Sequence, residues 1–540
     1  MSYSKFILHY LSPHKLKIAI FFLLCTLGWL LSVGLPYITG NFIDKIIALK
    51  DISVIIFFTK AIILFSVLDM INTYIVTMIT VNFKTKIVYK INYDLIEYVK
   101  RLPLDFFNSN DSAYLNQRIN QDSNQIVNFI FDNVLGFILS IFTLVGVVTI
   151  VWRINYKILF IILLIIPCYI LFYYFFRKKL YKNSLELRES QNKLFSKMNE
   201  QFKIIKLIKI NVWFQELGRR MDDKFNIFFK STMKNTKTTF FYNNFIKGLR
   251  YTCTILLICF GGIEIINNRM TIGNFTMINS YFFMLLDSTG FFLRFGQAWQ
   301  ENLVSWNRVR EIRFRDQDNN GSVKLESISE ISLTDLDFGY SSDKNIISRF
   351  NYTFEKGKIY GIVGNNGTGK STLIDLIIGL RYSYCGRISY NNIDMKDIDM
   401  YQLRKNHISL VEQEPVLLQD TVKNNIIFGL DKHDDDYLNN LCEDFGITDL
   451  LYSRVNDSGN IISENNTNVS GGEKQKISLI KSLLKNPDML ILDEPISALD
   501  ISTVNKLKEY LLKIKHSKII LIISHNNSIM DIVDNTISFT

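Results

Sequence analysis

The chain has 540 residues, of which 48% are hydrophobic and 21% are charged, with a formal net charge of +10. This length suffices for two or three domains. Its six cysteines form no Cys-x-x-Cys pair, so neither a zinc site nor a disulfide framework is indicated. The basic balance fits nucleic-acid binding or a membrane protein with Lys and Arg gathered on its cytoplasmic side.

Six long apolar stretches lie in the first half of the chain. A bilayer core needs roughly 20 apolar residues per helix, and a soluble domain has too little interior to bury six such runs. We therefore predict six membrane helices, the first of them retained rather than cleaved as a signal peptide. The stretches run approximately from Ile18 to Thr39, Ile52 to Val81, Phe129 to Trp152, Tyr156 to Phe176, Phe245 to Ile266, and Ile272 to Phe295.

The connections between these stretches differ in length and in charge. The second and fourth are long and rich in Lys and Arg, whereas the short ones carry few basic residues, such as Lys45, Lys50, Arg153 and Arg269. The positive-inside rule then places the long connections and both termini in the cytoplasm. Topology accounts for the net charge, so nucleic acid is not required as a partner. Helical spacing in the long connections predicts membrane helices that continue into the cytoplasm.

Two acidic residues fall within the apolar stretches, Asp69 in the second and Asp287 in the sixth. Carboxylates at membrane depth are costly and often functional. They could line a cavity that accepts a cationic peptide or drug, or form structural hydrogen bonds or ion pairs between helices. The sequence leaves both interpretations open.

A phosphate-binding loop opens the soluble half of the chain. The strand-like run Lys358 to Val363 precedes it, and an apolar helix from Thr372 follows. Glycines let the backbone amides wrap phosphates at the helix N-terminus, while the lysine contacts the β- and γ-phosphates and the serine ligates Mg²⁺. The loop consists of Gly364, Asn365, Asn366, Gly367, Thr368, Gly369, Lys370 and Ser371.

Two acids end a second buried-strand run, Met489 to Leu492. Asp493 is placed to hold Mg²⁺, and Glu494 to orient or polarise the attacking water. An apolar strand that ends in Asp-Glu is a weak signal alone, but downstream of a phosphate-binding loop it is a strong one.

Between these motifs, Ser470, Gly471, Gly472 and Glu473 begin another helix. The turn offers a second cluster of phosphate-binding amides, or it is an ordinary helix cap. One chain needs no second γ-phosphate cradle unless that cradle serves a nucleotide held by another subunit.

With these motifs in this order, the second half resembles the ATPase domains of ABC transporters, and the whole chain resembles the half-size exporters that include bacterial lipid and multidrug pumps. The expected fold class is an α-helical transmembrane bundle of six helices, exporter type, followed by an α/β P-loop NTPase domain. The expected domains are a transmembrane domain at 1–310, a linker at 311–330 and an ATPase domain at 331–540.

The resemblance implies further roles. Tyr340 matches the aromatic residue that stacks on adenine, Gln413 the glutamine that senses Mg²⁺ and the attacking water, and His525 the switch histidine at the γ-phosphate. Ser470 to Glu473 match the signature loop, with Glu473 where Gln is usual. Other matching positions are Glu464, which corresponds to an acid that touches the coupling helices, the D-loop Ser497 to Asp500, and coupling regions around Arg101 to Asp122 and Ile208 to Asn211.

The chain departs from the family at its ends. It stops at Thr540, where the family usually continues with a hairpin and a helix, so C-terminal dimer contacts are expected to differ. The short N-terminus leaves no room for the peptidase domain of some peptide exporters.

The resemblance predicts ATP-driven export across the plasma membrane by alternating access, with ATP and Mg²⁺ held between two half-transporters. The expected partners are a second half-transporter, membrane lipid, and a peptide (bacteriocin-like) or amphipathic cargo. The alternatives are a lipid flippase or multidrug efflux pump, a nucleotide-gated membrane regulator without transport, and a soluble ATPase that acts on ribosomes or DNA. Glu494 and His525 argue against the regulator, and the apolar stretches against the soluble ATPase.

Overall fold

The computed structural model describes residues 2–109, 112–340, 345–365, 367–452, 462 and 468–539. These residues form two compact units. The first comprises Met1–Val99 and Ala113–Phe314, and the second comprises Lys100–Ser112 and Arg315–Thr540. The second unit therefore includes a short segment that follows the second long helix.

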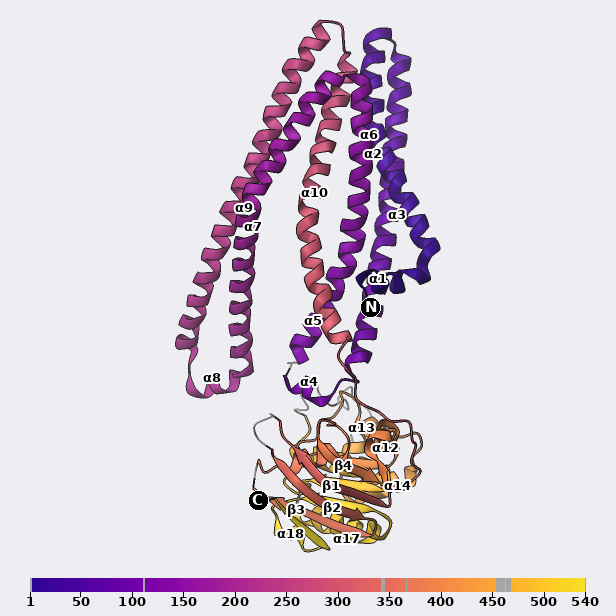
Figure 1. Cartoon of the computed structure of the whole chain (residues 1–540), viewed down its shortest axis with the longest axis vertical. Coiled ribbons are helices and arrows are strands. Elements are labelled where there is room, and N and C mark those ends of the chain that lie inside the picture. Colours follow the sequence, from indigo (N-terminus) through magenta and orange to yellow (C-terminus); the bar gives the residue numbers. More distant parts are fainter. Residues whose placement is uncertain are drawn as a thin grey trace. The chain divides into compact units, whose positions relative to one another are not determined.

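The first unit is helical throughout its main elements, and each predicted apolar stretch lies on one long helical segment (Figure 1). The third stretch passes from a π-helical segment, η2 (Phe129–Val134), into α6, after the helix α5 (Ser112–Asn128). A short N-terminal helix, α1 (Tyr3–Leu11), precedes them. The long helices are α2 (Lys15–Leu49), α3 (Ile52–Val99), α6 (Leu135–Ile154), α7 (Tyr156–Lys203), α9 (Phe214–Ile266) and α10 (Ile272–Arg313).

Within the described ranges, five helical segments are long and apolar enough to cross a membrane: Tyr3–Leu49, Ile52–Val99, Arg118–Ile154, Tyr156–Lys203 and Phe214–Ile266. The sixth predicted helix, α10, is not among these five. Its apolar stretch carries Asn274, Asn279 and Asp287, which lower its hydropathy. Polar residues inside a membrane bundle usually face its interior or a water-filled cavity, so α10 is the helix on which polar function is expected.

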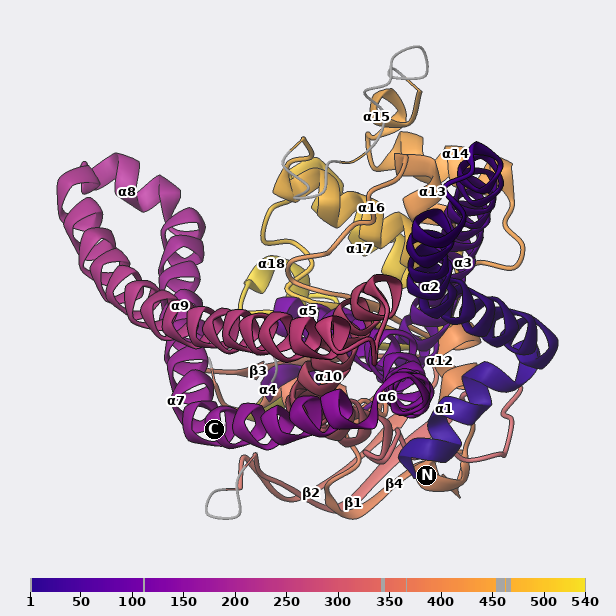
Figure 2. The same ribbon diagram turned by 90° about the horizontal axis from the view of Figure 1, so that it is seen from above.

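Two of the long helices, α7 and α9, pack against each other and are joined by α8 (Ile205–Asn211). Figures 1 and 2 show this pair diverging from α2, α6 and α10 toward α8. Val212 ends α8 with a φ of 56°. The helical character predicted for the long connections is confirmed, because α3, α7 and α9 all continue well beyond their apolar stretches.

The second unit contains two sheets within the part of the chain that is described. One is four-stranded, in the order β2-β1-β4-β5, and the other is five-stranded, in the order β6-β7-β8-β3-β9. The strands are β1 (Glu330–Phe338), β2 (Ile347–Glu355), β3 (Lys358–Gly364), β4 (Cys385–Tyr390), β5 (Ile393–Asp394), β6 (Ile408–Val411), β7 (Met489–Asp493), β8 (Ile519–Ile523) and β9 (Asn535–Phe539).

Helices surround these sheets. Those that bear on the site are α4 (Leu104–Ser109), α11 (Lys370–Ile377), α16 (Gly471–Leu484) and α17 (Ile501–Ile514). The others are α12 (Met400–Asn406), α13 (Val422–Ile427), α14 (Asp435–Asp444), α15 (Thr448–Tyr452) and α18 (Asn527–Met530).

The five-stranded sheet is parallel and forms the centre of the second unit. All five residues of β8 are buried, as expected for a parallel strand covered on both faces. Because β7 and β3 flank β8 in the same direction, the carboxyl ends of the three strands meet at one edge of the sheet. Ligands of open α/β sheets bind at such an edge.

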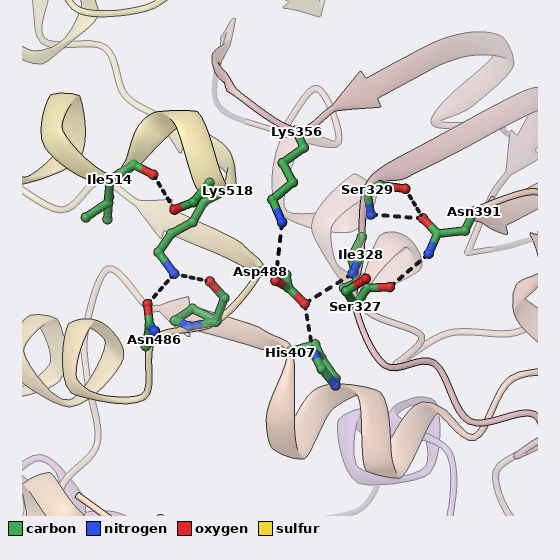
Figure 3. A network of polar contacts seen from close by, with 12 residues as sticks. Ser327, Ile328, Ser329, Lys356, Asn391, His407, Asn486, Asp488, Ile514 and Lys518 are labelled. Atoms are coloured by element: carbon green, nitrogen blue, oxygen red, sulfur yellow. Dashed lines mark hydrogen bonds and ion pairs between the residues drawn. The ribbon is translucent and has the colours of Figure 1, made fainter. Parts of the chain in front are cut away.

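The start of β7 is tied to the segment that enters β1 (Figure 3). One carboxylate oxygen of Asp488, Oδ2, accepts the backbone N–H of Ile328 at 3.1 Å and lies 2.7 Å from Nδ1 of His407. The other, Oδ1, lies 3.9 Å from Nζ of Lys356. Asp488 therefore fixes the approach to β1 against the base of the parallel sheet. With the helical membrane part and this α/β part, the predicted fold class is confirmed.

Candidate functional site

The loop between β3 and α11 places the predicted phosphate-binding residues at the sheet edge. Gly369 caps α11 with a φ of 101°, and a Cβ there would lie 2.5 Å from Cγ2 of Ile346. Glycine satisfies both the left-handed backbone and the close approach. Nζ of Lys370 donates hydrogen bonds to the carbonyls of Gly364 and, at 3.1 Å, Asn365. The lysine thus closes the loop from inside, while Asn366 lies outside the described residues.

Ser371 and Asp493 face each other across this edge. Oγ of Ser371 lies 3.5 Å from Oδ2 of Asp493 at the end of β7. Burial raises the pKa of the Asp493 carboxyl, and the neighbouring charge of Glu494 raises it further. A hydroxyl and a carboxylate are oxygen donors of the kind that suits Mg²⁺. In the described part of the chain, no group of three or more His, Cys, Asp or Glu side chains could hold a metal ion.

Glu494 has a strained backbone at the same edge. Its φ is 45°, unusual for a residue with a side chain, and its N–H donates to the carbonyl of Ile523 at 2.9 Å. The carboxylate accepts a hydrogen bond from Oγ of Ser524 at 3.3 Å and lies 3.9 Å from Nε2 of His525. Strain of this kind gathers at functional sites. The backbone conformation aims the carboxylate at the end of β8.

His525 links this acid to the phosphate-binding loop. Its Nε2 lies 3.1 Å from Nζ of Lys370. The structure therefore brings together five predicted side chains from three strand ends: Lys370, Ser371, Asp493, Glu494 and His525.

Tyr340 lies beside the start of α11. Its hydroxyl is 3.0 Å from Oγ1 of Thr372, and the residue is 57% exposed. The guanidinium of Arg381 lies 4.8 Å from the centre of its ring. An exposed aromatic residue beside the phosphate-binding loop is suited to stacking on a base.

The Ser-Gly-Gly turn begins α16 with a complete capping box. Oγ of Ser470 accepts the N–H of Glu473 at 3.3 Å, and the Glu473 carboxylate accepts the N–H of Ser470 at 2.7 Å. The cap interpretation is therefore correct locally, yet Ser470 and Gly471 stay exposed. Among the described residues, neither forms a hydrogen bond with Lys370. The predicted Glu464 lies outside the described residues.

Gln413 has an exposed side chain, and its backbone carbonyl is held by a residue whose role the sequence analysis missed. This residue is Gln475 on α16, which is 2% exposed. Its Nε2 donates to the carbonyl of Gln413 at 3.3 Å and to Oγ of Ser497 at 2.7 Å, and its Oε1 accepts the N–H of Ala498 at 3.1 Å. A glutamine on the apolar face of a predicted helix is the signal that could have revealed it.

Arg381 is a second residue whose role was not predicted from the sequence. It is 4% exposed, and its Nε donates to Oδ2 of Asp375 on α11 at 3.0 Å. It also forms an ion pair with Asp105 on α4. A charged residue directly after an apolar helix was the available signal, but its partner lies far away in sequence.

Two family models match most of the chain. The family model described as the ABC transporter transmembrane region matches residues 18–289, and the model described as ABC transporter matches residues 347–497. Together with the site, these matches define a membrane transporter driven by ATP hydrolysis. The chain belongs to the ABC transporter family. The predicted enzyme class, an ATPase coupled to transmembrane transport, is confirmed, as is the half-size exporter type.

Individual relatives are distant but nearly full-length. The ATP-dependent lipid A-core flippase of Syntrophus aciditrophicus is 24% identical over 526 residues, which cover 96% of this chain and 86% of the flippase. An uncharacterized ABC transporter ATP-binding protein of Bacillus subtilis is 23% identical over 98% of this chain and 89% of its own length. The structure of a bacterial Atm1-family ABC exporter with ATP bound has the same fold, with a TM-score of 0.84 and 17% identity over 97% of this chain and 93% of that one.

Proposed function

We propose that two copies of this half-transporter, or this chain and a related partner, export a substrate across the plasma membrane by alternating access. The cargo is a peptide (bacteriocin-like) or an amphipathic compound. A lipid flippase or multidrug pump is the alternative, and the similarity to the lipid A-core flippase of Syntrophus aciditrophicus favours a lipid. The long basic connections support a cytoplasmic ATPase domain with both termini on the same side.

The observation that carries this proposal is the convergence of Lys370, Asp493, Glu494 and His525 at one sheet edge. At this site Lys370, the loop amides and Thr372 bind phosphate, and Tyr340 stacks on adenine. Glu494 orients the attacking water, with Gln413 and His525 beside it. These groups act by positioning and electrostatics, without a covalent intermediate. Ser371, Asp493 and Gln413 would hold Mg²⁺, which would neutralise phosphate charge.

The dimer supplies the second half of each site. Ser470, Gly471, Gly472 and Glu473 of one copy contact the γ-phosphate of ATP held by the other. One observation supports this assignment. Ser470 and Gly471 are exposed at a helix start, and helix N-termini bind anions.

The test replaces Glu494 by Gln in the full-length protein in nanodiscs. We expect steady-state ATP hydrolysis to fall by at least about 100-fold, because a water-orienting base contributes about that much. ATP binding should persist, and added ATP should trap the dimer in size-exclusion or mass-photometry measurements. Glu509→Gln, at an exposed position on α17, is the matched control and should hydrolyse ATP normally. Wild-type hydrolysis by Glu494→Gln would refute the assigned role.

A further inference from the structure

A cavity of about 380 Å³ lies between α7, α9 and α10 of the first unit. Three tyrosines line it, Tyr169 and Tyr173 from α7 and Tyr242 from α9. The only charged side chains in its lining, all within the described residues, are Arg250, Asp287 and Arg294. The cavity is therefore polar and aromatic, and part of its lining lies at membrane depth, where charges are costly and usually functional.

The charges of this lining do not balance. Oδ1 of Asp287 lies 2.8 Å from an Nη of Arg250, so these two side chains neutralise each other across α9 and α10. Arg294 forms no hydrogen bond or ion pair with any residue in the described ranges. One guanidinium is thus left to give the cavity a net positive charge.

The depth of these groups follows from the helix rise. The apolar stretch of α10 begins at Ile272. At a rise of 1.5 Å per residue, Asp287 lies about 22 Å and Arg294 about 33 Å from Ile272 along the helix axis. The hydrocarbon core is about 30 Å thick. In the orientation proposed above, Arg294 lies at the level of the inner-leaflet headgroups, and the Arg250–Asp287 pair lies deeper.

We infer that this cavity binds the anionic group of an amphipathic substrate, a phosphate or carboxylate, at Arg294. A guanidinium binds such groups through two parallel hydrogen bonds. The hydroxyl of Tyr173 is not an additional donor, because it already donates to the carbonyl of Leu293 at 2.9 Å. The apolar part of the substrate lies along the membrane-embedded part of α7 and α10. This inference rests on the proposed export function and specifies its cargo.

The same geometry disfavours a cationic cargo held by Asp287. That carboxylate is already paired with Arg250, and a cation would have to displace a tethered guanidinium from it. Asp69 is not part of the cavity lining.

The test measures binding directly, so that it does not depend on ATP hydrolysis. Radiolabelled oleoyl lysophosphatidic acid is titrated onto full-length protein in phosphatidylcholine nanodiscs, with oleoyl lysophosphatidylcholine and oleylamine as zwitterionic and cationic competitors of the same chain length. We expect the anion to bind at least tenfold more tightly than either competitor. Arg294→Gln should weaken its binding at least tenfold. Arg153→Gln, on α6 and outside the cavity lining, is the matched control and should leave binding unchanged.

A second variant separates the two readings of Asp287. Asp287→Asn frees Arg250, so an anion-binding cavity should hold lysophosphatidic acid several-fold more tightly, whereas a cation-binding cavity should lose oleylamine. Tighter oleylamine than lysophosphatidic acid binding in the wild type, or an unchanged affinity in Arg294→Gln, would overturn the inference. Competition by glycerol phosphate would indicate a water-soluble anion as the source, and its failure a lipid headgroup. Absence of ATP hydrolysis by the wild type would instead refute the proposed function. Because ligand binding is measured separately, that outcome can be distinguished from a failure of this inference.

Discussion

Arg381 forms an ion pair with Asp105, so the helix that follows the phosphate-binding loop is tied to the segment after α3. Arg381 is 4% exposed at its side chain and Asp105 is 51% exposed. The same guanidinium binds Asp375 on α11 and lies over the ring of Tyr340. A change at the nucleotide base or at α11 would therefore reach α4 through one side chain.

A double-mutant cycle tests this connection. We expect Asp105→Asn and Arg381→Gln to show a coupling energy of at least about 1 kcal/mol in denaturant unfolding of the full-length protein, because contacting residues in one polar network couple by 0.5–3 kcal/mol. The exposed pair Lys423–Asp435, 3.1 Å apart, is the control and should couple by about 0.5 kcal/mol or less. Additive effects at Arg381 and Asp105 would show that their contact transmits nothing.

Local sequence patterns predicted the parts of the site that depend on local structure. The phosphate-binding loop needs glycines directly before a helix, and the acids at the end of β7 need only an apolar strand before them. The long helices followed equally well from hydropathy. The ion pairs between these helices could not be predicted from hydropathy, because the pairing of Asp287 with Arg250 depends on how α9 and α10 are rotated and aligned.

Arg381 and Gln475 show the same limit. Arg381 finds Asp105 across 276 residues, and no sequence spacing encodes that contact. Gln475 binds the loop after β6 and the loop after β7 at once, which requires the folded arrangement of α16, β6 and β7. The roles assigned to the site residues stay predictions, and those of Asn366 and Glu464 concern positions outside the described residues.

Asp488 should contribute to the stability of the second unit. Its carboxylate serves the N–H of Ile328, the imidazole of His407 and the ammonium of Lys356 (Figure 3). We expect Asp488→Ala to lower the free energy of unfolding by about 1–3 kcal/mol, because a buried donor is left without an acceptor.

Asp488→Asn keeps one acceptor oxygen, so its free energy of unfolding should fall by roughly half as much. Thermal or denaturant unfolding of both variants and the wild type provides the measurement. Equal stability of Asp488→Ala and the wild type would show that water replaces the carboxylate at no cost.

Asp500 should make the attachment of α17 depend on pH. It caps this helix, accepting the N–H of Thr503 at 3.2 Å and its hydroxyl at 2.7 Å, and it pairs with Nζ of Lys476 on α16 at 3.1 Å. Hydrogen bonds from Ser502, Thr503 and Lys476 hold the pKa of this carboxyl well below its usual range. The folded state therefore favours the ionised form more than the unfolded state does. The resulting stability is complete above the ordinary Asp pKa of about 4 and is lost as the pH falls below it.

Asn is also a good helix cap, so Asp500→Asn isolates the effect of the charge. We expect it to be less stable than the wild type at pH 7, by no more than about 1 kcal/mol because the pair is partly exposed, with the difference shrinking as the pH falls from 4 to 3. Asp500→Ala also loses the cap and should be about 1 kcal/mol less stable than Asp500→Asn at every pH. Unfolding curves of the three proteins at matched pH provide the measurement. A wild-type advantage over Asp500→Asn that stays constant down to pH 3 would mean that the carboxylate charge contributes nothing, and that Asp500 acts through hydrogen-bond geometry alone.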